Sequence, residues 1–285
     1  NLAADILKSQ GDAKLNQSTN FNKLTQYGIW GTKSPEVNIH SASELKLLNP
    51  EELIKKIHSI TSYQHRILYY GPMTQETFTT EINRLHRVPD TLLPIPEGIE
   101  FKQQMITEPK VLLAKYDAKQ IYMSMISNRG ESFDETINPA MSMYNEYFSG
   151  SMNAIVFQEM REARGLAYSA GAYLITPSKL KYPYIFRTFI ATQNDKMDDA
   201  LKAFDSIIND MPLSEKAFNL AKDALITRLR TERIIKSDVL WTYIQATDLG
   251  MKHDNRKELF EQAQTMTLAD LKAFQEKWIK GRNYI

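Results

Sequence analysis

Three prolines within residues 88–99 constrain this sequence more than any other feature. Pro89, Pro94 and Pro96 lie in this short segment, and proline can neither continue a helix nor donate to a strand ladder. Before the segment, apolar residues recur at helical spacing, and after it strand-like alternation begins. The sequence therefore predicts two units, residues 1–87 and 100–285, joined by an extended linker over 88–99.

The first unit is predicted to be mostly helical. A helix opens the chain and stops at Gly28, and Ser43 caps a second, short helix. Asn49-Pro50 starts a third, because the asparagine side chain can accept an orphan N–H and proline suits the first helical position. The pattern also predicts a strand at His65–Tyr70 and a helix at Thr74–His86.

The second unit is predicted to mix strands with helices. The expected strands are Lys110–Tyr116, Gln120–Ser127, Leu166–Thr176 and Tyr184–Thr192. The expected helices run from Asn138-Pro139 to Gly150, from Ala154 to Arg164 with Asn153 as the cap, along an apolar stripe from Met197 to Ile208, from Ser214 to Ile234, from Ser237, from Lys257 to Ala263 and from Leu268 to Lys280. This order predicts an α+β fold in which helices pack on one face of an antiparallel sheet.

An internal echo links the two units. Leu48–Leu53 and Met266–Leu271 both combine a helix cap, an acidic first turn and a leucine. Their offset is 271 − 53 = 218 residues. A strand is expected after the first copy, and Tyr284-Ile285 occupies the equivalent place after the second. The chain is therefore expected to hold the tail of one α+β repeat and most of a second, which is truncated at its last strand.

Composition excludes several classes of function. The chain has 35 lysines and arginines against 34 aspartates and glutamates, so the net charge is 35 − 34 = +1, and a nucleic-acid partner is not expected. No apolar run is long enough for a membrane span. There is no cysteine, and none of the five histidines has the H-E-x-x-H or H-x-x-E-H spacing of a zinc helix. No metal site is predicted in this chain.

Residues 157–169 carry the most functional information. They combine an amphipathic helix with arginines in its last turn, a glycine stop and a strand of small residues. Arg161 and Tyr168 lie 168 − 161 = 7 residues apart, with Gly165-Leu166 between them. Elementary chemistry explains this without a function, because arginines complement the dipole at a helix C-terminus and Tyr168 suits a half-buried strand.

The same segment resembles the helix–glycine–strand signature in the C-terminal domains of pitrilysin/insulinase-type zinc metallopeptidases, the inverzincins. Pro50–Gly71 is also similar to the helix and edge strand that end a domain of this family. The resemblance implies a LuxS/MPP-like metallopeptidase fold. The family's zinc motif is missing here, so the resemblance is to a C-terminal, non-zinc portion that is not active alone.

The resemblance also implies roles for individual residues. Arg161 and Tyr168 would be catalytic, and Arg161, Tyr168, Gly165 and Leu166 would contact substrate. The substrate would be a peptide or unfolded polypeptide, and the N-terminal zinc-bearing half or a partner subunit would supply zinc. Substrates of this family add a strand to a sheet edge, and the strand predicted at Leu166–Thr176 is a candidate neighbour.

Two other functions stay open at this point. The chain is also compatible with a non-catalytic family member that serves as a partner subunit. A scaffold or peptide-binding module unrelated to peptidases is the second alternative. The sequence leaves the compartment open between the bacterial periplasm and the cytoplasm.

Overall fold

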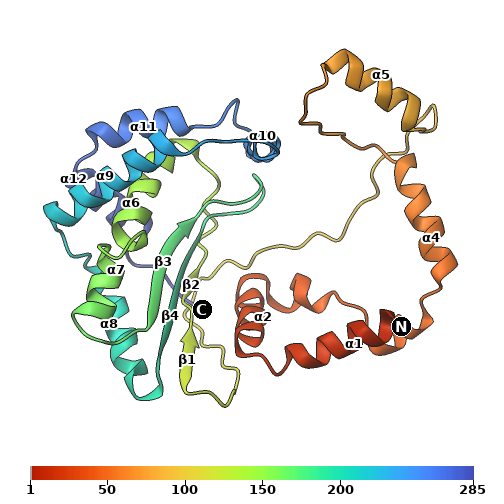
Figure 1. The fold of residues 1–285 in the computed structure, drawn as a ribbon. Coiled ribbons are helices and arrows are strands. Elements are labelled where there is room, and N and C mark those ends of the chain that lie inside the picture. Colours follow the sequence, from red (N-terminus) through yellow and green to blue (C-terminus); the bar gives the residue numbers. More distant parts are fainter. Residues whose placement is uncertain (1) are drawn as a thin grey trace.

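The computed structural model describes residues 2–285 and contains one antiparallel sheet (Figure 1). The central strand is β4 (Ile185–Gln193). It pairs along one edge with β3 (Ser169–Ile175) and along the other with β1 (Gln120–Met123) and then β2 (Ile126–Ser127). The predicted α+β class is therefore confirmed.

Helices and short helical turns make up most of the rest of the chain. In the first part these are α1 (Leu2–Ala13), α2 (Gln17–Trp30), η1 (Gly31–Lys33), η2 (Pro35–Val37), α3 (Ala42–Leu47), α4 (Pro50–Ser59), η3 (Ile60–Ser62) and α5 (Gln75–Leu85). After β2 follow η4 (Glu135–Ile137), α6 (Asn138–Ser149), α7 (Ile155–Phe157), η5 (Gln158–Glu162), η6 (Asn194–Lys196), α8 (Met197–Asn209), α9 (Glu215–Thr231), α10 (Asp238–Asp248), α11 (Arg256–Thr265) and α12 (Leu268–Trp278).

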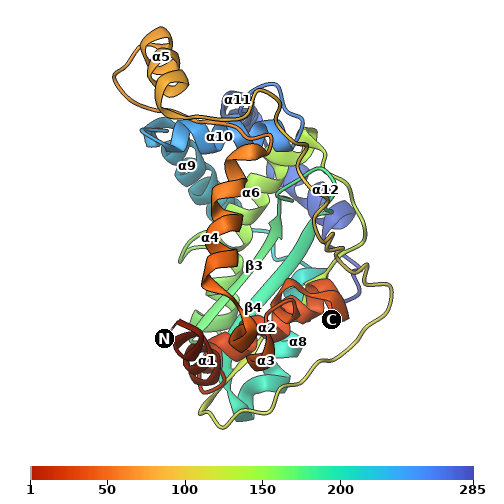
Figure 2. The same cartoon turned by 90° about the vertical axis from the view of Figure 1, so that its right-hand side faces the viewer.

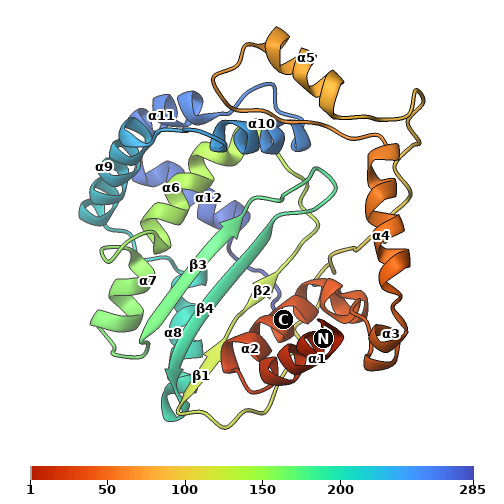
Figure 3. The ribbon, with the colours of Figure 1, turned by 45° about the vertical axis from the view of Figure 1, so that its right-hand side comes forward.

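The main core lies between one face of the sheet and the helices of the second part. Along β4, every second side chain faces these helices and is buried, as strand geometry requires: Phe186, Thr188, Ile190 and Thr192. From α6 and α12, Tyr144 and Phe274 meet with ring centroids 5.5 Å apart. Figure 3 shows α6 and α12 behind the sheet and α8 beside the end of β4.

Helix α2 covers part of the opposite face of the sheet. Its Phe21 contacts Tyr122 of β1 and Phe189 of β4 edge to face, at centroid distances of 5.7 and 5.8 Å. A small apolar cluster continues this contact and consists of Ile106, Ile126 and Ile185, with Ile29 and Ile285 against them. Helix α2, which precedes the proline segment, thus covers part of the sheet that the second part of the chain forms. The domain boundaries at 87/88 and 99/100 stay a prediction.

Several predicted helix ends are confirmed by their capping bonds. Asn49 accepts the N–H of Glu51, Thr74 that of Thr77, and Ser214 that of Ala217. Others were misplaced. The opening helix breaks where Asn16 caps α2, and α2 runs past Gly28 to end at Gly31, whose φ of 69° suits glycine. Ser41, not Ser43, caps α3 through a capping box with Glu44.

Three strand predictions fail wholly or in part because the ladder that each requires is missing or interrupted. Within residues 2–285, segment 65–70 pairs with no strand, and only an isolated bridge joins Tyr63 to Leu93. Segment 110–116 is also extended without a ladder, although Lys110 N–H bonds Tyr284 O at 3.0 Å. The strand at Gln120–Ser127 splits because the Thr188 hydroxyl takes the N–H of Met125.

An arm made of α4, α5 and their extended connections projects from the rest of the molecule (Figures 1 and 2). Its apolar side chains are uncovered, with Ile54 52% and Ile57 62% exposed. Within the arm the Nε2 atoms of His65, after η3, and His86, after α5, lie 2.7 Å apart, so one imidazole donates to the other. An apolar helix face of this kind marks a surface that another structure covers.

A buried ion cluster holds the tail that follows α12. The Arg282 side chain is fully buried and donates to Glu131 Oε2 at 2.9 Å, and its Nε donates to Trp278 O at 2.6 Å. Arg129 pairs with the same carboxylate and also reaches Lys277 O. Ile285 then exchanges two backbone hydrogen bonds with Ile126 of β2. One carboxylate therefore pairs with two guanidinium groups and connects the tail to the loop after β2.

We predict that Glu131→Gln lowers the free energy of unfolding by about 3 kcal/mol, because it leaves the buried Arg282 without a counter-charge. Urea denaturation measures this. The matched control is Glu81→Gln, since Glu81 pairs with Arg84 at the surface and its loss costs below about 1 kcal/mol. Equal effects of the two substitutions would contradict the role of Glu131.

Candidate functional site

The residues that the sequence singles out lie on one connection, from η5 to β3. The helix predicted at Ala154–Arg164 differs from expectation. It begins as one α-helical turn, α7, without the Asn153 cap, and continues as the π-helical turn η5. The N–H of Ala163 accordingly bonds Gln158 O, five residues back, at 2.8 Å. Such π turns inside helices are frequent at functional sites, and Arg161 lies in this one.

Gly165 ends the helical segment in a left-handed conformation, with φ of 58°. Its N–H bonds Arg161 O at 3.0 Å, and the N–H groups of Leu166 and Ala167 both bond Met160 O, at 2.8 and 3.1 Å. This is the glycine stop that the sequence predicts, because glycine alone adopts such a φ without steric cost. The turn directs the chain from the helix back toward the sheet.

The outgoing side of the turn is held by β4 and by η6, the short turn after it. The Thr192 hydroxyl donates to Leu166 O at 2.5 Å, and Lys196 Nζ donates to Gly165 O at 3.0 Å. Tyr168 N–H bonds Ala191 O, the residue that also faces Ser169 in the β3–β4 register. Backbone groups of the Gly165–Tyr168 segment are thus bound to the helix on one side and to β4 and η6 on the other.

Tyr168 is the exposed side chain on this fixed segment. Its side chain is 73% exposed, and its hydroxyl makes no hydrogen bond within residues 2–285. A tyrosine on a strand that is buried on one face usually packs or finds a partner for its hydroxyl. Here the phenol is free to donate a hydrogen bond to a ligand.

Arg161 lies nearby in sequence but faces a different environment. Its guanidinium lies 5.0 Å from the ring centre of Phe157 and 3.8 Å from Glu162 Oε1, and its side chain is half exposed. In the described part of the chain no hydrogen bond or ion pair joins it to Tyr168. The two residues are therefore available to one ligand but are not preassembled with each other.

A pocket of about 190 Å³ adjoins Tyr168. It unites three of the four predicted site residues, Gly165, Leu166 and Tyr168, and leaves out Arg161. The remaining lining residues are Gln120, Ala167, Thr192, Gln193 and Lys196. Sequence reasoning missed Lys196. Its only signal was a lysine at the start of a helix whose first turn is acidic, a position that does not favour a cation.

A second cation lies on the sheet face that α2 partly covers. Arg187 of β4 stands opposite Tyr173 of β3 and donates from Nε to Ser124 Oγ at 3.3 Å. Burial lowers the pKa of its guanidinium from the ordinary value. No carboxylate pairs with Arg187 among the residues that the structure describes.

The outer edge of β3 is partly closed to an added strand. The N–H of Ala172 bonds Ser149 Oγ at 2.9 Å, and the amide group of Asn145 bonds both the N–H and the carbonyl of Leu174. Side chains of α6 therefore occupy the positions that an incoming peptide backbone would need at these two residues. A peptide that adds to this edge has to avoid Ala172–Leu174.

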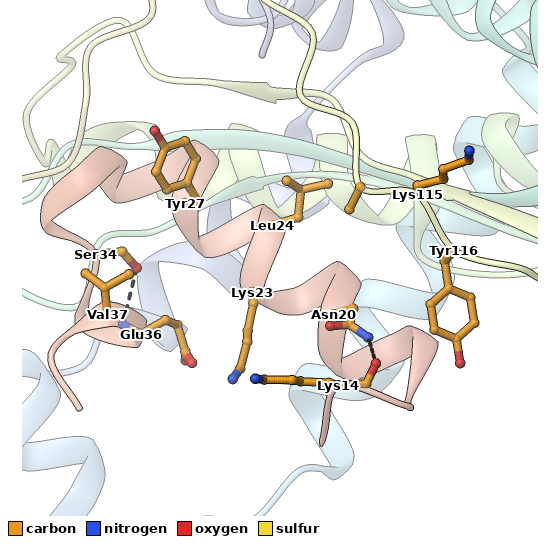
Figure 4. A pocket seen from close by; sticks show the side chains of 11 residues that line it. Lys14, Asn20, Lys23, Leu24, Tyr27, Ser34, Glu36, Val37, Lys115 and Tyr116 are labelled. Atoms are coloured by element: carbon orange, nitrogen blue, oxygen red, sulfur yellow. Dashed lines mark hydrogen bonds between the residues drawn. The ribbon is translucent and has the colours of Figure 1, made fainter. Parts of the chain in front are cut away.

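A larger pocket, of about 410 Å³, lies away from the predicted site residues. Its walls come from α2, from the turn after it and from residues 114–116 (Figure 4). Lys14, Lys23 and Lys115 line it together with Glu36, and the Tyr116 hydroxyl donates to Leu15 O at 2.6 Å. None of the residues predicted for catalysis or substrate binding contributes to it.

The described residues do not fit a zinc ion. No group of three or more histidines, cysteines, aspartates or glutamates within residues 2–285 is arranged to hold a metal. The donor set that zinc requires, three or four nitrogen, sulfur or carboxylate ligands, is therefore not formed here. As for the membrane, no helix of residues 2–285 has the length and apolar character needed to cross it.

A family model for the peptidase M16 inactive domain matches residues 87–225. The chain contains a peptidase M16 inactive domain. This confirms the resemblance to the C-terminal, non-zinc portion of these metallopeptidases, which rested on the segment from Arg161 to Tyr168. The matched range covers the sheet, the pocket beside Tyr168 and helices α6 to α8. No curated protein sequence matches the chain significantly.

Solved structures share the fold of this M16 domain. A peptidase M16 inactive domain from Pseudomonas fluorescens matches 96% of this chain and 66% of its own length, with a TM-score of 0.68 and 15% identity. A conserved protein from Enterococcus faecalis V583 matches 96% of this chain and 64% of its own length, with a TM-score of 0.69 and 13% identity. The ferredoxin protease FusC, solved in complex with Arabidopsis ferredoxin, matches 99% of this chain and 31% of its own length, with a TM-score of 0.69 and 13% identity. The chain thus spans just under two thirds of the Pseudomonas and Enterococcus structures and just under one third of FusC.

We predict that Gly165→Ala lowers the free energy of unfolding by about 1 kcal/mol, because alanine is strained at positive φ although its Cβ would meet no neighbour. Gly165→Asn should cost less, since asparagine tolerates this region better. Urea denaturation compares them with Gly98→Ala, where space is equally free and φ is not positive. A loss for Gly98→Ala as large as that for Gly165→Ala would refute the assigned cause.

Proposed function

We propose that this M16 domain is the C-terminal, non-zinc half of a zinc metalloendopeptidase, which closes over a peptide substrate and presents Tyr168 and Arg161 to the zinc-bearing half. The observation that carries the proposal is the exposed phenol of Tyr168 on a segment whose backbone is bound on both sides. An unsatisfied donor on a backbone held in place is suited to a developing oxyanion.

Tyr168 would donate its hydrogen bond to the oxyanion of the tetrahedral intermediate. Because the segment from Gly165 to Tyr168 is already fixed, little reorganisation opposes this bond when the substrate binds. Arg161 would hold a substrate carbonyl or carboxylate, a task that suits the planar guanidinium fork. Its loose contact with Glu162, at 3.8 Å, leaves that fork free to turn toward a ligand.

Zinc and the hydrolytic step would belong to the other half. Residues 2–285 offer no group of three or more side chains that could hold a metal, so we assign no step at the metal to them. Their part is to bind, orient and enclose the substrate. The substrate class is a peptide or unfolded polypeptide, and the solved relatives whose names describe proteases, among them the periplasmic protease PqqL of Escherichia coli, support this class.

The uncovered face of α4 supports a second α+β unit as the partner. The internal echo equates α4 with α12, where Leu271 and Phe274 are buried against the sheet-and-helix core. On α4 the residue equivalent to Leu271 is Leu53, which is 41% exposed, and the neighbouring Ile54 and Ile57 are more than half exposed. The N-terminal zinc-bearing half, as part of the same polypeptide or as a partner subunit, would cover it.

A non-catalytic partner subunit or peptide-binding scaffold is the alternative. The separation of Arg161 from Tyr168 in the free domain favours it, because neither side chain is preassembled with the other. The two proposals differ in what the Tyr168 hydroxyl does. In a scaffold, removal of the Tyr168 hydroxyl would change peptide binding but not turnover.

We predict that Tyr168→Phe in the complete zinc-bearing protein lowers kcat about 100-fold, since one oxyanion donor contributes roughly 3 kcal/mol. Zinc content, measured by atomic emission, should not change. Tyr173→Phe on β3 is the control, because the Tyr173 hydroxyl bonds Ser149 O and takes no part in the proposed site. Unchanged turnover in Tyr168→Phe would reject the catalytic role and favour the scaffold.

We also predict that residues 1–285 alone bind no stoichiometric zinc and hydrolyse no peptide, but recover activity when the zinc-bearing half is added. Fluorogenic peptide cleavage with and without that half measures this. Hydrolysis by the isolated chain would overturn the proposed division of labour between the halves.

A further inference from the structure

The pocket beside Tyr168 is lined by a cation, Lys196, that no carboxylate of residues 2–285 pairs with. Lys196 donates one hydrogen bond, to Gly165 O, and an ammonium group carries three donors. Within residues 2–285 it forms no salt bridge. The residue is partly buried and lines the pocket, so an anionic ligand in the pocket would lie close enough to pair with its charge.

The location of Lys196 is not explained by the helix that follows it. Lys196 is the residue before α8, and a positive charge at a helix N-terminus opposes the helix dipole. The acidic residues suited to this end, Asp198 and Asp199, occupy the first turn and are exposed, and neither pairs with Lys196. Asp195, next to Lys196, is exposed and unpaired with it too. The lysine therefore does not stabilise the helix, whereas it would stabilise an anion bound in the pocket.

The pocket has the size of one side chain or chain terminus. Its volume of about 190 Å³ is below the range of roughly 300–1,000 Å³ that encloses a small-molecule ligand. Leu166 and Ala167 supply apolar walls, and Gln193 and the Tyr168 phenol supply neutral polar groups beside the ammonium. Carboxylate is the ligand chemistry that matches one cation flanked by neutral donors.

We infer that this pocket is a carboxylate subsite for the substrate, in which Lys196 binds an acidic side chain or the C-terminal carboxylate of the peptide next to Tyr168. The inference rests on the proposed function, because it places the substrate at Tyr168. It adds a substrate class: peptides with a carboxylate close to the bond that is cleaved.

The test uses the complete zinc-bearing protein and sets of peptides that differ only in charge. One pair carries aspartate or asparagine near the cleaved bond, and a second pair ends in a free carboxylate or an amide. We expect the protein to prefer one of the acidic peptides about tenfold in kcat/KM, and Lys196→Met to lose this preference. Lys196→Arg should retain it, and Lys202→Met, which removes an exposed lysine of α8, should leave it unchanged.

The pair that shows the preference identifies the source of the carboxylate. Absence of a preference in both pairs overturns the inference. So does an equal loss by Lys196→Met on acidic and neutral peptides, because that result would mean that Lys196 only supports the Gly165 turn.

Binding gives a readout that does not depend on catalysis. Fluorescence anisotropy of the same labelled peptides, on the chelator-treated protein, should show the acidic preference and its loss in Lys196→Met. If the preference in binding persists while Tyr168→Phe leaves turnover unchanged, the subsite stands and the catalytic role of Tyr168 fails. If Lys196→Met binds acidic and neutral peptides as the unsubstituted protein does, the subsite fails whatever Tyr168 does.

Discussion

The antiparallel pairing of β3 with β4 is the contact on which the rest of this structure depends. Its register runs from Ser169–Ala191 to Ile175–Ile185 and fixes which side chains face the helices. A shift by one residue would move Phe186 and Ile190 out of the core. The same pairing determines where the chain enters β3, and so where Tyr168 lies. Core packing and the candidate site are therefore two results of one strand register.

Much of this architecture follows from local sequence signals. The Asn49-Pro50 and Ser214 caps and the Gly165 stop were predictable because each depends on neighbouring residues only. The predictions at His65–Tyr70 and Lys110–Tyr116 failed because a strand exists only when another strand pairs with it. Residues 65–70 have the composition of a strand and no partner within residues 2–285. The π turn at η5 was equally hidden, since its hydrogen-bond pattern depends on how the turn packs against α8 and β3.

In the candidate site, too, residues close together in the sequence could be predicted, whereas residues that only the fold brings together could not. Arg161, Gly165, Leu166 and Tyr168 form a continuous motif, so a resemblance to a family could find them. Lys196 and Thr192 lie up to 31 residues away along the chain and reach the turn only because β4 returns beside β3. What distinguishes Tyr168 from an ordinary strand tyrosine is this support from a distant strand. Sequence spacing alone has no way to express it.

The uncovered apolar face of α4 makes the stability of the arm depend on whether another structure covers that face. The helix has ten residues, fewer than an isolated helix needs to persist in water. Its cap at Asn49 and its acidic first turn contribute only local stabilisation, and its apolar side chains contribute nothing until they are covered. The order of this segment is thus linked to occupation of its face, and its amide protons would exchange at different rates in the free and assembled states. If the zinc-bearing half covers this face as proposed, the exchange of these amide protons would measure the assembly of the two halves.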